Sequence, residues 1–160
     1  MKHITIILAF LMTLSSPVVG QDFDKGWAAY KAQDYDAALK EFLPLGNKGD
    51  ATSQNKLGYM YMLGYGVPQD DKEAFKWFMK AAKQEVSKSM VQLGVMYKNG
   101  NPVPQDYVLA HMWFNIAAAL GETDAYRGLM EFDTTPAAIQ EAQAMARKCM
   151  ESDYKECGTY

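Results

Sequence analysis

Side chains that commonly carry out chemistry are few in this sequence. Beyond residue 20 there is one histidine, His111, and no second histidine to complete a nucleophile and base pair of the usual kind. The two cysteines, Cys149 and Cys157, do not stand with His111 at the spacing of a zinc site. We therefore expect no catalytic residue, no cofactor, no metal ligand and no enzymatic activity.

Acidic pairs and a glycine-rich segment have structural explanations. Asp22 and Asp24, like Asp70-Asp71, precede helical patterns, where carboxylates stabilise the first turn, and no calcium-loop pattern surrounds them. Gly64-Tyr65-Gly66 follows a helical pattern and lacks the downstream Lys-Ser/Thr of a phosphate-binding loop. Function is therefore expected on a surface rather than at a reactive group.

The first twenty residues have the pattern of a secretory signal peptide. Lys2 gives a basic start, Ile4 to Leu14 is apolar, and Val18-Val19-Gly20 forms a small-residue cleavage site. A membrane-spanning helix is the competing interpretation, but the apolar run is too short for a hydrocarbon core of about 30 Å. The expected product begins after Gly20, has no integral membrane segment, and is periplasmic or secreted.

Composition narrows the classes of partner. The chain has 16 Lys and Arg residues against 19 Asp and Glu residues, a net charge of −3, and removal of Lys2 makes it one unit more negative. A mildly acidic chain without a basic run argues against nucleic acid and anionic lipid as main partners.

The cysteines suggest a closed C-terminal tail. An oxidising compartment favours a disulfide between Cys149 and Cys157. Eight residues on a straight helix span about 12 Å, beyond the reach of a disulfide, so the helix should end soon after Met150 and the tail should fold back. A redox-active pair is the alternative, but it usually has a Cys-x-x-Cys spacing, which is absent.

A segment that occurs twice must position whatever surface the protein uses. The residues from Leu57 to Ala82 return from Leu93 to Ala118, each partner 36 residues further on and without insertion. Both copies contain Leu-Gly-x-Met-Tyr, Val-Pro-Gln-Asp and Trp-Phe-x-x-Ala-Ala. A fixed period of this length indicates a repeat architecture, and the three- and four-residue steps predict helices.

Details of the repeat predict how its helices meet. A helix should run from about Asp50 to Leu63 and end at Gly64, and Asp70 should start the next. Gly58 in a helix interior costs about 1 kcal/mol relative to Ala, so we expect another helix to approach it closely. Pro102 replaces Gly66 in the second copy, so that loop should take a different path.

This repeated pattern resembles the Sel1-like repeat family, a relative of the tetratricopeptide repeats. The resemblance implies an all-α fold: an α/α solenoid of helical hairpins, closed by a C-terminal capping helix. First helices would line a concave face and second helices the outside. We expect one domain over residues 21–160, with an atypical first hairpin at 22–46, full repeats at 50–85 and 86–121, a closing hairpin at 122–151 and a disulfide-closed tail at 152–160.

Positions that vary between copies are the candidates for recognition. They lie on one stripe of each first helix and would together form a shallow groove suited to a protein or peptide. The alternative is ordinary solvated helix surface. The predicted partner-binding residues are Thr52, Asn55, Tyr59, Met62, Lys88, Val91, Val95, Lys98, Asp124 and Arg127.

The resemblance implies an exported scaffold or adaptor that holds a protein or peptide partner in the cell envelope. An alternative is an enzyme or binder acting on cell-wall material or β-lactams, as credited to secreted cysteine-rich relatives. Those relatives carry a cysteine pair in most units, whereas this chain has one pair, so that activity is not carried over. A structural role through self-association is a third possibility, and the sequence leaves the oligomeric state open.

Overall fold

The protein is described by a computed structural model that covers residues 22–130, 135–155 and 157. This part of the chain contains helices and no strand. The elements, in chain order, are α1 (Phe23–Lys31), α2 (Tyr35–Asn47), α3 (Ala51–Leu63), α4 (Asp71–Ala82), α5 (Ser87–Asn99), α6 (Tyr107–Ala119), α7 (Thr123–Met130) and α8 (Pro136–Glu151).

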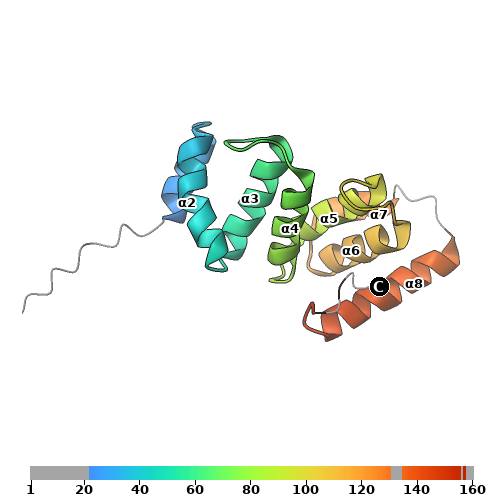
Figure 1. The fold of residues 1–160 in the computed structure, drawn as a ribbon. Helices are drawn as coiled ribbons and strands as arrows, with labels where there is room; N and C mark the ends of the chain where they lie inside the picture. The colour runs from blue at the N-terminus through green and yellow to red at the C-terminus, as the bar shows by residue number, and fades with distance from the viewer. Residues whose placement is uncertain (1–21, 131–134, 156, 158–160) are drawn as a thin grey trace, which may run out of the picture.

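The helices form a row of antiparallel hairpins, as the repeat predicts (Figure 1). Each helix from α1 to α6 packs against the next along the chain. In addition, α3 contacts α5 and α5 contacts α7, so the first helices approach one another across units more closely than the second helices do. The array is therefore an α solenoid whose inner side is formed by first helices.

Carboxylates begin most of these helices. Asp34, Asp50, Asp70 and Asp106 each accept a hydrogen bond from a backbone N–H in the first turn of the following helix, at 2.6 to 3.1 Å. Free N–H groups at a helix start need such an acceptor. The predicted start at Asp70 is confirmed. α5 differs, because Val86 precedes it and has no side chain that can accept a hydrogen bond.

Recurring glycine and phenylalanine pairs join the two helices of each hairpin. A Cβ atom on Gly58 would lie 2.5 Å from the Phe78 ring, and one on Gly94 would lie 2.9 Å from the Phe114 ring. Both rings are fully buried. The expected close approach at Gly58 is therefore confirmed, and the group that fills the space is an aromatic ring of the second helix.

Two loops of the same length reach the second helices by different backbone paths. Gly64 and Gly100 end α3 and α5 in the left-handed region, with φ near 70° in both. Gly66 has φ +70°, and a Cβ there would lie 2.8 Å from the Tyr35 carbonyl oxygen. At the matching position, the ring of Pro102 excludes the positive φ that Gly66 adopts, so the two loops take different paths, as predicted.

The C-terminal helix covers α6. The sequence predicts α7 and α8 as a closing hairpin, but the main neighbour of α8 is α6 (Figure 1). The reason is the composition of α6, whose eight buried residues lie around the whole helix. A helix that is apolar all round must be covered on every side, and the eight-residue α7 is too short to do so.

A disulfide closes the tail, as predicted. α8 ends at Glu151, and Cys149 is bonded to Cys157 with a Cα–Cα distance of 4.9 Å. Between them, Tyr154 is buried and lies close to Glu85 in the turn between α4 and α5. Burial raises the pKa of Tyr154, and the nearby Glu85 carboxylate raises it further. The tail therefore reaches back to the boundary between the two repeats.

The predicted signal peptide lies outside the described residues. Among residues 22–130, 135–155 and 157, none of the helices combines the length and apolar character needed to span a membrane.

Candidate functional site

Three adjacent hollows lie along the inner side of the solenoid. They have volumes of 390, 180 and 140 Å³ and share lining residues, so we describe them together as the inner groove. Its walls come from α3, α5 and α7. Phe114 of α6, the start of α4, the residue before α7 and the loop after α5 also contribute. The first helices therefore position the groove, because their mutual approach leaves their varying side chains on one continuous face.

Most of the predicted partner-binding residues line this groove. Those that do are Tyr59, Met62, Lys88, Val91, Val95, Lys98, Asp124 and Arg127. Thr52 is exposed on α3 and lines none of the three hollows. The fold thus brings eight of the ten residues to one surface, whose role in binding is a proposal made below.

Asn55 has a structural position. Its side chain is 5% exposed and its Nδ2 donates a 2.7 Å hydrogen bond to the Ser89 hydroxyl. This bond joins α3 to α5 inside the solenoid, where a buried amide requires a partner. Because a buried and occupied side chain offers nothing to a ligand, we correct the prediction and assign Asn55 to the framework.

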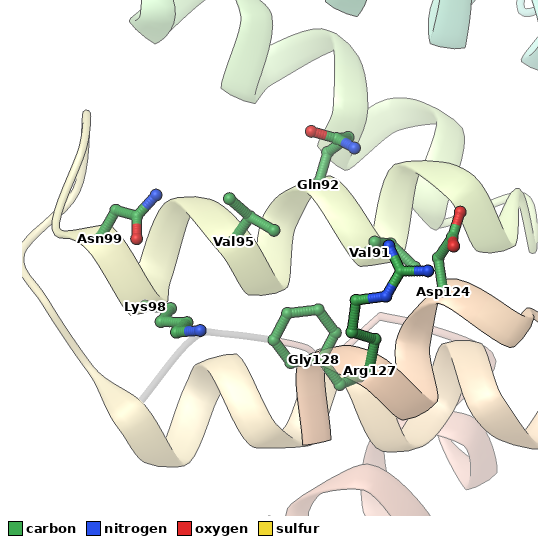
Figure 2. Close-up of a pocket in the computed structure, with 9 residues that line it drawn as sticks. Val91, Gln92, Val95, Lys98, Asn99, Asp124, Arg127 and Gly128 are labelled. Atoms are coloured by element: carbon green, nitrogen blue, oxygen red, sulfur yellow. The ribbon is translucent and has the colours of Figure 1, made fainter. Parts of the chain in front are cut away.

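The largest hollow combines an apolar floor with charged walls. Figure 2 shows Lys98 entering it from α5 and Arg127 from α7, with Val95 between them and the Arg127 guanidinium near Asp124. Its lining residues are Val91, Gln92, Val95, Lys98, Asn99, Phe114, Asp124, Arg127 and Gly128. A segment bound here could bury apolar side chains and bind the amide and charged groups at the rim.

Gln92 is a groove residue that the sequence interpretation missed. It lines all three hollows and makes a side-chain hydrogen bond with Tyr59. Burial is the largest influence on the pKa of Tyr59 and raises it, while the hydrogen bond with Gln92 acts in the opposite direction. Gln92 follows Val91 and precedes Val95 by three residues, so a stripe two residues wide would have included it.

Trp27 and Tyr30 extend the inner surface onto α1, and they were also missed. Gly26 faces the Phe42 ring, where a Cβ would lie 2.8 Å from it, as Gly58 faces Phe78. This contact aligns Trp27 with Tyr59. The 36-residue period relates Asp34 to Asp70 at the start of the second helices, but the first hairpin has a shorter loop, so its first helix does not follow that period. Aligning the glycines would have found both residues.

An aromatic cluster with a lysine occupies this end of the inner surface. Trp27 and Tyr30 are stacked with centroids 5.5 Å apart, and Tyr35 and Tyr65 are stacked at 4.1 Å. The Lys56 ammonium lies 3.9 Å from the centroid of the Trp27 ring. Burial lowers the pKa of Lys56, and the positive charge of Lys88 lowers it further. The cations of α3 and α5 are thus near enough to repel each other.

His111 is buried in α6, apart from the groove residues. Its Nδ1 lies 2.6 Å from Asn115 Nδ2, and because an amide N–H donates, Nδ1 is the acceptor. Burial lowers the pKa of His111, which favours this neutral ring. Within residues 22–130, 135–155 and 157, no three His, Cys, Asp or Glu side chains are grouped so that they could hold a metal ion.

Comparison with known proteins places the repeats in a family. The model of the Sel1 repeat matches residues 51–86 and 87–122. No curated protein matches the chain.

Two solved structures are similar in fold and sequence. One is a protective antigen present in uropathogenic Escherichia coli strains, described as displaying an SLR fold, with 28% identity and a TM-score of 0.75 over 82% of this chain and 30% of that chain. The other is a Sel1 repeat protein from Oxalobacter formigenes, with 30% identity and a TM-score of 0.62 over 65% of this chain and 43% of that chain. This chain therefore spans less than half the length of either protein.

Proposed function

We propose that this chain, which contains two Sel1 repeats, is an exported scaffold that binds a protein or peptide partner in the inner groove without catalysis. Sel1 repeats often serve in protein–protein interaction. The cell envelope is the proposed setting. The signal-peptide pattern of residues 1–20 and the disulfide between Cys149 and Cys157 support export.

One observation carries the proposal. The framework positions recur at 36-residue steps and are buried, such as Leu57 with Leu93 and Phe78 with Phe114. The groove positions differ between the same helices, as in Tyr59 with Val95 and Met62 with Lys98. A surface of varying side chains on a constant frame is how repeat proteins specify partners.

Partner capture in whole cells tests the proposal. Cross-linking followed by mass spectrometry should recover a partner with the wild-type protein. The variant Lys88→Glu with Lys98→Glu and Tyr59→Ala should recover it at least tenfold less, because all three side chains line the groove. Circular dichroism should show the same helicity for both proteins.

A matched variant separates the groove from general surface effects. Lys40→Glu with Lys72→Glu and Tyr107→Ala makes the same chemical changes on the outer helices α2, α4 and α6, at exposed positions. It should retain capture. Equal capture by all three proteins would contradict a role for the groove.

Two further measurements address the remaining parts of the proposal. N-terminal sequencing of the protein from the periplasm or medium should begin at Gln21. Turnover of a chromogenic β-lactam or of peptidoglycan fragments by the purified protein would contradict a non-catalytic scaffold. Sedimentation of the same sample determines whether self-association accompanies its role.

A further inference from the structure

Helix α5 is the axis of the inner groove. One stripe of this helix, made of Lys88, Gln92, Val95 and Asn99, is half-buried or exposed, and each of its side chains lines at least one of the hollows. Gln92 lines all three. The stripe is about 16 Å long, a length that about five residues of extended peptide cover. We refer to these four residues below as the α5 stripe.

Two of the hollows lie on opposite sides of the α5 stripe. The 390 Å³ hollow lies between α5 and α7, and the 140 Å³ hollow lies between α5 and the end of α3. Gln92, Val95 and Asn99 line both of them. The 180 Å³ hollow continues the path toward the start of α5, beside Lys88. Because successive side chains of an extended chain point to opposite sides, a peptide on this stripe would direct them alternately into the two flanking hollows.

The two amides of the α5 stripe can bind a peptide main chain. The hydrogen bond between Gln92 and Tyr59 lowers the pKa of Tyr59, so the Gln92 amide N–H is the donor and the phenol oxygen the acceptor. That bond does not use the Gln92 amide oxygen, which can accept a hydrogen bond from a main-chain N–H. Asn99, exposed at the other end of the stripe, has the same groups. The hollows are therefore adjacent to groups that complement a peptide bond.

The remaining lining argues against other classes of ligand. Nucleic acid needs an excess of cations, but the lining has as many carboxylates as cations. Sugar rings and nucleobases bind by stacking on open aromatic faces, whereas Tyr59 is half-buried against the Phe78 ring at 5.1 Å and Phe114 is 1% exposed. The charged lining residues are Lys88, Lys98 and Arg127 together with Asp71, Glu122 and Asp124.

We propose that the inner groove binds an extended peptide along α5, with its main chain hydrogen-bonded to Gln92 and Asn99 and one apolar side chain on Val95 in the hollow between α5 and α7. This inference rests on the proposed function, because it names the conformation and the chemistry of the partner bound at that site. Figure 2 shows Val95 between Lys98 and Arg127, whose aliphatic parts extend the apolar contact. The main chain and the apolar side chain decide binding, and the net charge of the peptide contributes little.

Selection from a library of random twelve-residue peptides provides the probe. The bait is the purified protein, produced with its own N-terminal segment in an exporting bacterial host. Enriched peptides should share an apolar residue and carry no excess of either charge. Their affinity should change by less than twofold when salt is raised, because a charge-balanced lining gives little net attraction to screen.

Ester substitution in the best peptide then tests the main-chain contacts. Replacing one amide by an ester removes a single N–H donor and adds no bulk. Two positions should be sensitive, each weakening binding about fivefold, as expected for one hydrogen bond. Gln92 and Asn99 are about 10 Å apart along α5, so these positions should lie about three residues apart. Gln92→Ala should remove the sensitivity at one position and Asn99→Ala at the other.

Matched variants remove the same groups elsewhere. Gln140→Ala on α8 and Asn47→Ala on α2 alter exposed amides outside the groove and should leave both ester effects unchanged. Circular dichroism should show the same helicity for all variants. If Gln92→Ala does not fold, Gln92→Met keeps the length of the side chain, lacks the amide, and should give the same result.

The outcomes separate this inference from the proposed function. Ester effects that disappear in the Gln92 and Asn99 variants support the inference. Peptides that lose binding in the Lys88→Glu, Lys98→Glu and Tyr59→Ala variant overturn it if no ester weakens them, or if the ester effects persist without Gln92 and Asn99, and they leave the proposed function standing. Enriched peptides that bind every variant equally, or no enrichment at all, overturn both.

Discussion

The two Sel1 repeats have the same sequence pattern but different surroundings. In the first repeat, α4 keeps an exposed side with Lys72, Lys76 and Lys80, because none of the described helices covers it from outside. In the second, buried residues lie all round α6 between Leu109 and Ala117, because α8 lies along it. The comparison teaches that the repeat encodes the hairpin, while the position in the array decides which of its residues become core.

Single residues show the same contrast. Trp77 is 5% exposed and the Lys80 ammonium lies 3.9 Å from its ring centroid. Its counterpart Trp113 is fully buried, and its Nε1 has no hydrogen-bond partner among the described residues. Phe75 is half-buried, whereas the equivalent His111 is buried. Among the second helices, the more enclosed α6 therefore holds a histidine ring and an indole N–H away from water, and α4 does not.

Breaking the glycine and phenylalanine contact should have the largest effect. Phe78→Ala and Phe114→Ala should each lower the free energy of unfolding by about 3–5 kcal/mol, because both rings fill closed space. The loss should be greater at Phe114, which packs against glycines on two helices, Gly94 and Gly128. Urea unfolding measures both. Leu63→Ala, at a 47% exposed side chain, is the control and should change stability by less than about 0.5 kcal/mol.

Removal of the disulfide should destabilise the second repeat selectively. Cys149→Ser with Cys157→Ser should lower the free energy of unfolding by about 2–3 kcal/mol, because the unfolded chain gains freedom. Hydrogen exchange should become faster in α6 and α8, which the tail holds together, and remain unchanged in α3. Equal acceleration in both repeats would contradict the idea that the tail supports its own end of the array.

Substitutions at the N-caps of α3 and α5 should change stability by less and in opposite directions. Asp50→Ala should lower the free energy of unfolding by about 1 kcal/mol, because the Ser53 N–H loses its acceptor at 2.6 Å. Val86→Asp gives α5 the cap that α3 has and should raise stability by up to about 1 kcal/mol. Thermal unfolding of both variants is the measurement, and shifts of the same sign would count against the capping explanation.

The smallest expected effect is a dependence on pH in the second repeat. Burial lowers the pKa of His111 from 6.5, so the unfolded chain binds its proton more readily than the folded one. Stability from this group is therefore complete above pH 6.5 and decreases as the pH falls below that value. His111→Phe, which installs the residue of the first repeat, should remove this part of the slope between pH 7.5 and 5.5. An unchanged slope in urea titrations would contradict it.

Much of the fold followed from local patterns. The 36-residue period predicted the paired hairpins, Asp70 predicted a helix start, and the two cysteines predicted a tail that folds back. Such features depend on residues close in sequence, whose backbone and capping chemistry acts within one or two turns. Eight of the ten predicted partner-binding residues line the groove for the same reason, because each shares a helix face with the others on its helix.

The missed features depend on contacts between distant elements. Asn55 was predicted on the binding surface, but its side chain is buried and hydrogen-bonded to Ser89 of α5. Lys56 becomes part of the inner surface because the Trp27 ring of another helix lies beneath its ammonium. The periodicity of a single helix predicts which residues share a face. The neighbouring helix determines how much of that face remains exposed.

The sequence by itself determined the helical hairpins, their 36-residue repetition and the residue types available to the inner face, because periodicity and capping are local properties. The tertiary structure decided that α8 covers α6, that the Cys149–Cys157 tail reaches Glu85, and that side chains from α3, α5 and α7 share one groove. These outcomes required the curvature of the array, which arises from packing between helices far apart in the chain and from no single segment of it.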